Sequence, residues 1–100
     1  MSTWYHDRAL SLINSYILEL KRPKLKAKRE QFMHRSFSIW AAEECYEYVR
    51  THDYIPPLDA VNAFIRIMED YSCLNPYASI YFSMASDTGK DILDRLLTYI

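Results

Sequence analysis

The fold of this 100-residue chain is decided near its middle, in the stretch His52-Asp53-Tyr54-Ile55-Pro56-Pro57 and the apolar repeat after it. Proline disfavours helical geometry in the residue before it, so a helix arriving from the N-terminal side must end here. Pro57 itself suits the first position of a new helix, where its missing N–H costs nothing. The repeat that follows has helical spacing and consists of Leu58, Val61, Phe64, Ile65, Met68 and Tyr71. This stretch therefore predicts a helix over about 57–74.

Prolines divide the rest of the chain in the same way. Pro23 ends a first predicted helix over about 3–21, and a long second helix is predicted over about 24–51. Asn75-Pro76 has the pattern of an N-cap followed by a first-turn proline, which predicts a last helix over about 76–99. The stripes predicted to face the core comprise Trp4, Ala9, Leu10, Ile13, Tyr16, Ile17 and Leu20 in the first helix, Met33, Phe37, Trp40, Ala41, Cys45, Tyr48 and Val49 in the second, and Tyr77, Ile80, Tyr81, Met84, Ala85, Ile92, Leu93, Leu96, Leu97 and Ile100 in the last.

Glycine is nearly absent, with Gly89 the single instance where average usage gives about seven. Tight hairpins need the positive φ that glycine adopts most easily, so a chain without glycine has few places to turn. Gly89 itself allows either a break at 86–89 or one continuous helix. We favour the continuous helix, because an interior glycine costs only about 0.5–1 kcal/mol. The predicted fold is all-α, a four-helix bundle-like single domain over 1–100.

The sequence also bears on the compartment of the protein. Its N-terminus lacks a basic start followed by an apolar run, and no apolar stretch approaches the roughly 18–20 residues of a membrane span. We therefore expect a cytoplasmic protein without a membrane partner. In that compartment Cys45 and Cys73 are expected to be buried, reduced thiols.

Charge is segregated along the chain. Residues 1–35 carry eight Lys or Arg against three Asp or Glu, whereas residues 36–100 carry four against ten. The basic cluster comprises Lys21, Arg22, Lys24, Lys26, Lys28 and Arg29. Three interpretations fit it: a solvated helix start facing the acidic part of the same domain, a docking segment for an acidic protein surface such as another copy, or a contact to the phosphates of a nucleic acid. The overall acidic balance and the lack of a recognition motif weigh against the last.

No catalytic constellation, cofactor motif or metal site emerges from the residue types and their spacing. Glu30 and His34 share a helical face without a second ligand pair. The carboxylate pairs Glu44/Glu47 and Asp91/Asp94 loosely match the magnesium-binding pairs of helical nucleotide pyrophosphatases, although the second pair begins with Asp and the gap is long. A magnesium-dependent nucleotide hydrolase is therefore the least favoured hypothesis.

The second half, about 54–97, resembles small uncharacterised helical proteins of Gram-positive bacteria and their mobile elements. The residues that carry the resemblance are Tyr54-Ile55-Pro56-Pro57, Ile80-Tyr81-Phe82-Ser83-Met84-Ala85 and Asp87 with Asp91-Ile92-Leu93-Asp94. It implies a bacterial cytoplasmic origin and provides no information about activity, cofactors or site residues. With nine tyrosines, which are favoured at interfaces, the leading hypothesis is a non-enzymatic protein–protein interaction module, acting as a homodimer or an adaptor. The alternative is an accessory nucleic-acid-binding protein that uses residues 21–29.

Overall fold

The computed structural model describes residues 4–22 and 29–99, with side chains described for 4–22 and 35–99. It contains four helices, α1 (Trp4–Lys21), α2 (Arg29–Thr51), α3 (Pro57–Leu74) and α4 (Ser79–Tyr99), and no strand within these ranges. The all-α, four-helix prediction is confirmed. Residues 24–28 of the predicted second helix lie outside the described residues. No helix in the described part is long and apolar enough to cross a membrane.

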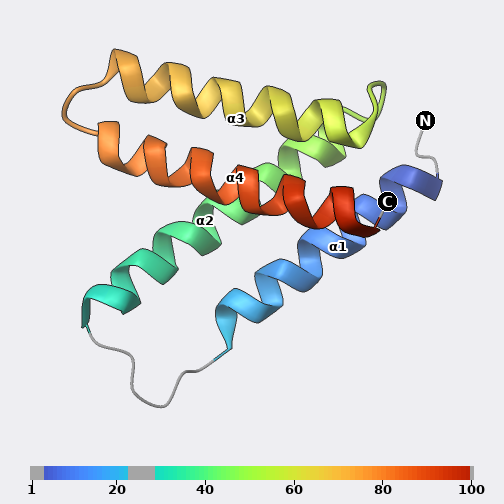
Figure 1. The fold of residues 1–100 in the computed structure, drawn as a ribbon, viewed down its shortest axis with the longest axis horizontal. Helices are drawn as coiled ribbons and strands as arrows, with labels where there is room; N and C mark the ends of the chain where they lie inside the picture. The colour runs from blue at the N-terminus through green and yellow to red at the C-terminus, as the bar shows by residue number, and fades with distance from the viewer. Residues whose placement is uncertain (1–3, 23–28, 100) are drawn as a thin grey trace.

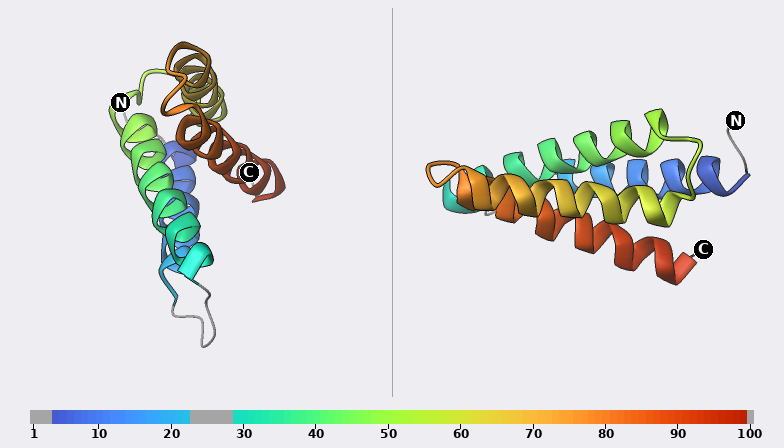
Figure 2. Two further views of the ribbon diagram at one scale, coloured as in Figure 1. Left: turned by 90° about the vertical axis from the view of Figure 1, so that its left-hand side faces the viewer. Right: turned by 90° about the horizontal axis from the view of Figure 1, so that it is seen from above.

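The helices form two hairpins that pack as two layers. The α1–α2 hairpin lies obliquely under the α3–α4 hairpin, and the views from the side and from above agree on this arrangement (Figures 1 and 2). The molecule measures 41 × 36 × 20 Å, and the shortest dimension equals about two helix diameters of 10–12 Å. The α3–α4 turn lies at one end, while the two termini and the α2–α3 connection lie at the other (Figure 1).

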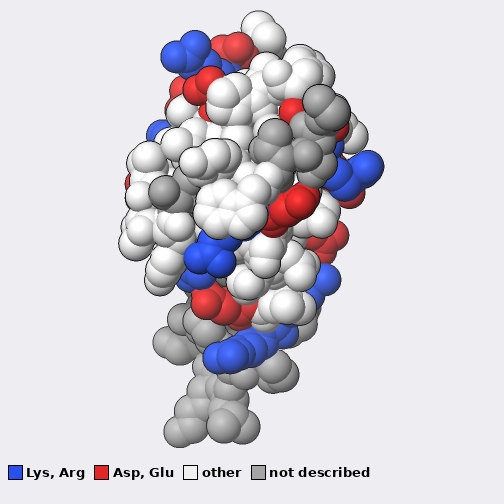
Figure 3. All heavy atoms as spheres, turned by 90° about the vertical axis from the view of Figure 1, so that its right-hand side faces the viewer, with Lys and Arg blue, Asp and Glu red and all other residues white. Residues whose placement is uncertain are grey.

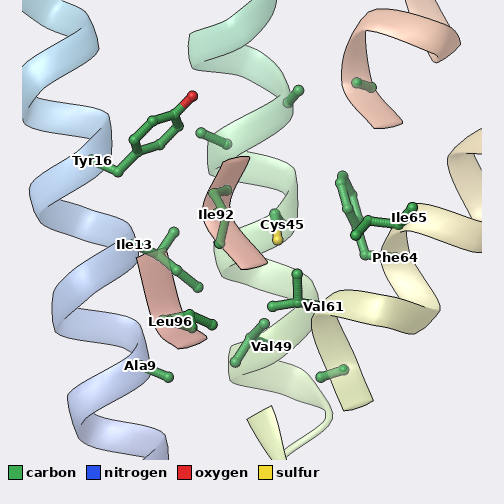
Figure 4. Close-up of a cluster of buried hydrophobic side chains, with 14 of the residues drawn as sticks. Ala9, Ile13, Tyr16, Cys45, Val49, Val61, Phe64, Ile65, Ile92 and Leu96 are labelled. Atoms are coloured by element: carbon green, nitrogen blue, oxygen red, sulfur yellow. The ribbon is translucent and has the colours of Figure 1, made fainter. Parts of the chain in front are cut away.

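The core lies where the two layers meet, and all four helices contribute to it (Figure 4). Small residues on α2 allow neighbouring helices to approach closely, and branched side chains of α1, α3 and α4 fill the remaining space. The buried apolar residues are Ala9, Ile13, Tyr16, Ile17, Ala41, Ala42, Cys45, Val49, Ala60, Val61, Phe64, Ile65, Met68, Ala85, Ile92 and Leu96.

Several large apolar residues that the stripes place in the core are exposed instead. Trp4 on α1 and Trp40 on α2 are at the surface, and so are Tyr77 and Ile80 near the start of α4. On α2 the buried face is centred on Ala41, Ala42, Cys45 and Val49, which turns Trp40 to the edge of the interface. Helical spacing alone does not show which of two adjacent apolar faces of a helix, one residue position apart, packs against the core. The prediction that tryptophan belongs to the core is wrong.

Gly89 lies inside α4, so the prediction of one continuous helix across it is confirmed. A methyl group at Gly89 would lie 2.7 Å from Ile65 Cγ1 and 3.3 Å from Phe64 Cδ1, both on α3. Gly89 has no positive φ. The single glycine of the chain therefore serves the close approach of α4 to α3 rather than a turn.

Asn75 and Pro76 do not begin α4 as predicted. The backbone N–H and the side-chain Nδ2 of Asn75 both donate to Tyr71 O at 3.0 Å, so Asn75 caps the C-terminus of α3. The Ala78 N–H then donates to Asn75 O at 3.1 Å, which closes a turn, and α4 starts at Ser79. The helix starts three residues later than predicted, because residues 75–78 form this turn and Phe82 N–H donates to Ala78 O at 3.2 Å at the start of the helix.

Candidate functional site

Two uncharged segments of the sequence meet where the start of α4 packs against the middle of α2. Residues 71–86 contain no charged side chain, and neither do residues 36–42, in a chain of which a quarter is charged. The fold brings these two segments into contact. We call the exposed or ring-stacked apolar residues of these two segments the aromatic face; they are Phe37, Trp40, Tyr71, Leu74, Tyr77, Ile80, Tyr81 and Phe82.

The aromatic face contains a groove of about 360 Å³ between α2 and α4. The Phe37 and Tyr81 rings, which both line it, stack directly on each other, with centroids 4.4 Å apart and an angle of 22° between the planes. The Tyr71 ring of α3 packs against the Phe82 ring, with centroids 5.3 Å apart. The residues that line the groove are Ser36, Phe37, Trp40, Ala78, Tyr81 and Phe82.

Three large side chains are exposed around the α3–α4 turn: one at the end of α3, one in the turn and one in the first turn of α4. Tyr77 is fully exposed, Leu74 is 75% exposed and Ile80 is 63% exposed. The turn is held by polar contacts within the protein: Ser72 Oγ donates to Ser79 O at 2.9 Å and lies 3.1 Å from Ser79 Oγ. The projecting side chains are thus carried by a backbone that hydrogen bonds already order.

A second pocket, of about 380 Å³, lies at the opposite end of the molecule beside the α2–α3 connection. It is lined by Tyr5, His6, Asp53, Tyr54 and residues 55–58. Figure 3 views this end, where charged atoms of both signs are scattered among the uncharged ones. His6 and Asp53 are not joined by a third metal-ligating side chain, because the described residues contain no group of three His, Cys, Asp or Glu that could hold a metal ion.

The two carboxylate pairs of the magnesium hypothesis do not come together. Glu44 and Glu47 border a shallow depression between α2 and α3, and Glu47 Oε2 accepts from Arg50 Nη2 at 2.6 Å. That pairing lowers the pKa of Glu47. Asp91 and Asp94 are exposed on α4, and no cluster of three metal-ligating groups forms within the described ranges. The structure therefore gives no support to a nucleotide hydrolase.

The two cysteines differ sharply in their surroundings. Cys45 is fully buried, and desolvation raises the pKa of its thiol to about 12, which makes it a poor nucleophile. Cys73 is also a free thiol but is exposed, so the prediction of two buried thiols is wrong for Cys73. The reason is its position on α3: it follows Met68 by five residues, off the face that carries Val61, Phe64 and Ile65.

The basic cluster lies mostly outside the described residues, which include neither Lys24, Lys26 and Lys28 nor the side chain of Arg29. Lys21 Nζ is 3.3 Å from Glu43 Oε1 of α2, with both side chains about half exposed, and Arg22 O accepts from Arg35 Nη1 at 2.8 Å. Lys21 therefore faces an acidic residue of its own domain, as the first of the three interpretations expects. Such an exposed pair contributes at most about 1 kcal/mol.

A further ion pair joins the two layers. Arg95 Nη2 of α4 donates to Glu19 Oε2 of α1 at 2.5 Å, and the Arg95 guanidinium lies 4.8 Å from the centre of the Tyr16 ring. The hydrogen bond from Arg95 lowers the pKa of Glu19, while burial and the neighbouring Asp91 raise the pKa of Tyr16. These contacts are structural, since Tyr16 belongs to the core.

No protein-family model, curated protein or solved structure matches the chain. The resemblance of residues 54–97 to small proteins of Gram-positive bacteria is not tested by these comparisons and stays a prediction. Function must therefore be argued from the surface itself. Sequence periodicity missed the aromatic face because it assigned Trp40, Tyr77, Ile80 and Tyr81 to the core; the signal that marks it is the run of uncharged residues from 71 to 86.

Proposed function

We propose that this chain is a non-enzymatic protein–protein interaction module that binds its partner through the aromatic face. The observation that carries the proposal is that large aromatic and aliphatic side chains are exposed on two segments of sequence that carry no charge, 36–42 and 71–86. Interface cores are depleted in charged residues and enriched in aromatic ones, and six of the eight members of the aromatic face are Tyr, Trp or Phe.

The size of the aromatic face supports the same function. Its six most exposed members are Trp40, Tyr71, Leu74, Tyr77, Ile80 and Tyr81. Given that a large apolar side chain presents roughly 150–250 Å² when fully exposed, their exposed fractions amount to on the order of 800 Å². The largest apolar patch on a typical monomer covers about 300–600 Å², whereas a standard interface buries about 800 Å² on each partner.

The setting we propose is a bacterial cytoplasmic or mobile-element system, on the strength of the resemblance of residues 54–97 alone. A nucleic-acid-binding role for residues 21–29 has no comparable support. A shift assay with duplex and single-stranded oligonucleotides tests that role directly, because phosphate binding must weaken steeply as salt is raised.

Site-specific photocrosslinking in the cells that naturally make this chain tests the interaction module. A photoreactive phenylalanine replaces Tyr77 on the aromatic face, and a matched variant carries it at Tyr99, which is exposed near the end of α4. Irradiation is expected to join the Tyr77 variant to a protein and to leave the Tyr99 variant largely unlinked. Equal labelling from the two positions, or none from Tyr77, would contradict the proposal.

A further inference from the structure

We infer that the groove of the aromatic face is one end of a longer groove, which binds a helix of a partner protein with large apolar residues at one end and Lys or Arg at the other. The inference rests on the proposed interaction function and names the chemistry of the partner. Three features support it: two hollows on one side of α2, the backbone chemistry of their walls, and the charge at one end.

The two hollows lie along the same side of α2. The groove of the aromatic face is lined on α2 by Phe37 and Trp40. A depression of about 270 Å³ between α2 and α3 is lined on α2 by Glu44, Tyr48 and Thr51. These five residues follow one another at three- and four-residue steps, which places them on one face of the helix. The two hollows are therefore consecutive parts of one surface.

The α3–α4 hairpin supplies the opposite wall of this surface. Phe82 of α4 lines the first hollow, and Ile67 of α3 lines the second. The Tyr71 ring, one helical turn beyond Ile67, packs against Phe82 and joins the two parts of the wall. Residues 37–51 of α2 span about 21 Å at 1.5 Å per residue, so the groove matches a helix of about four turns.

The backbone of the walls favours a helix over an extended peptide as the occupant. The lining residues lie on helices except Ala78, whose N–H and C=O groups are hydrogen-bonded at the α3–α4 turn. Backbone groups within a helix are paired along that helix, so they offer no partners to an extended segment. Such a segment would leave its own N–H and C=O groups unpaired against apolar side chains, which is unfavourable. A helical segment pairs these groups internally and presents only side chains to the groove.

The charge differs between the two ends of the groove. Among the described residues, none that lines the end at Trp40 is charged, whereas Glu44 and Glu47 line the other end. Arg50 pairs with Glu47, but no described residue forms an ion pair with the exposed Glu44. A Lys or Arg of the partner opposite Glu44 is therefore attracted, and an acidic side chain there is repelled.

Selection from a phage-displayed library of random 16-residue peptides, with the full chain as bait, tests the inference. The library is first depleted on the Trp40→Ala chain, so that the peptides retained afterwards depend on the groove. The wild-type chain is expected to retain peptides with apolar residues at three- and four-residue steps and with Lys or Arg one or two turns away. The Glu44→Lys chain should retain peptides with Asp or Glu at those positions instead. Asp94→Lys is the control, because Asp94 is exposed on α4 and lines neither hollow, and it should retain the same peptides as the wild type.

Fluorescence anisotropy of one peptide selected on the wild-type chain then measures each contribution. Tyr81→Ala, on the opposite wall, should raise Kd at least about tenfold, whereas Tyr99→Ala, at an exposed tyrosine outside the groove, should change it less than about twofold. Glu44→Lys should raise Kd at least about fivefold in 50 mM NaCl and less in 500 mM. A proline at the centre of the peptide should abolish binding, because proline interrupts a helix. Circular dichroism verifies that the chain variants remain helical.

Several outcomes would overturn the inference. These are a library without retained peptides, retained peptides without helical spacing, and a preference for Lys or Arg that persists on the Glu44→Lys chain. Sedimentation of the wild-type chain adds one more: dimers that the selected peptide dissociates would make a second copy the occupant. In each case the interaction module stands if Tyr77 is crosslinked to a protein in cells, so the failure of the inference is distinguishable from the failure of the proposed function.

Discussion

Replacing Gly89 by alanine should destabilise this protein, although alanine is the best helix former and glycine the poorest apart from proline. In a solvent-exposed helix, replacing glycine by alanine stabilises the helix by about 1 kcal/mol. Here the new methyl group would lie 2.7 Å from Ile65 Cγ1, closer than real Cβ contacts occur. Ile65 has little freedom to move away, because it is buried and a β-branched side chain in a helix has one preferred χ1 rotamer.

Overpacking of this kind costs about 1–3 kcal/mol, so the expected net destabilisation is about 0–2 kcal/mol. A double-mutant cycle separates the two contributions. In an Ile65→Ala background the neighbouring Cγ1 is gone, and Gly89→Ala should then stabilise the helix by up to about 1 kcal/mol. The coupling energy between the two positions should therefore be about 1–3 kcal/mol.

Urea unfolding followed by circular dichroism measures all four proteins of the cycle. Ser83→Ala, at an exposed position of the same helix, serves as the control for helix propensity without a packing change. The reasoning is refuted if Gly89→Ala stabilises the wild-type protein by about 1 kcal/mol and the coupling energy stays below about 0.5 kcal/mol.

Three further predictions concern the core and the thiols. Leu96→Ala, at a fully buried position, should lower the free energy of unfolding by about 2–5 kcal/mol. Leu97→Ala, at the exposed neighbouring position, should change it by no more than about 0.5 kcal/mol. Comparable losses for the two variants in urea titrations would contradict the core assignment. In a disulfide-exchange assay on the native protein, Cys73 should react at once and Cys45 only upon unfolding, so two rapidly reacting thiols would be inconsistent with this packing. Because the pKa of Cys45 is raised from 9.0 to about 12 in the folded protein, its contribution to stability is complete below pH 9 and falls by about 1.36 kcal/mol per pH unit above it. Cys45→Ala should reduce the loss of stability per pH unit without abolishing it. The remaining loss comes from Tyr16, whose pKa is also raised in the folded protein, so that its contribution to stability falls as the pH rises above the ordinary tyrosine value of 10.0. An unchanged slope in unfolding titrations between pH 8 and 11 would count against a buried thiol at Cys45.

The positions of the helices follow from local chemistry and could be predicted. Pro57 begins α3 as expected, Leu74 ends it, and α1 ends at Lys21 just before Pro23. These boundaries depend on the conformational limits of proline, which act within a few residues. The start of α4 was predicted less well, because Asn75 can cap the helix on either side and only its hydrogen bonds to Tyr71 decide which.

The candidate interface could not be predicted from periodicity for a related reason. Ile80 and Ile92 both occur at helical spacing in α4, yet Ile80 is exposed and Ile92 is buried. A stripe specifies that one side of a helix is apolar, but it does not specify which residues a neighbouring helix covers. That depends on where the α1–α2 hairpin crosses the α3–α4 hairpin, and only the assembled fold contains this information.

The sequence by itself thus determined the fold class, the number of helices and most of their ends, because backbone restrictions and apolar spacing act between residues that are close along the chain. The tertiary structure decided the purpose of Gly89, the contrast between Cys45 and Cys73, and the exposure of Trp40 and Tyr77. These depend on contacts between residues far apart in the sequence, where packing of whole side chains determines which apolar surface is covered and which stays exposed.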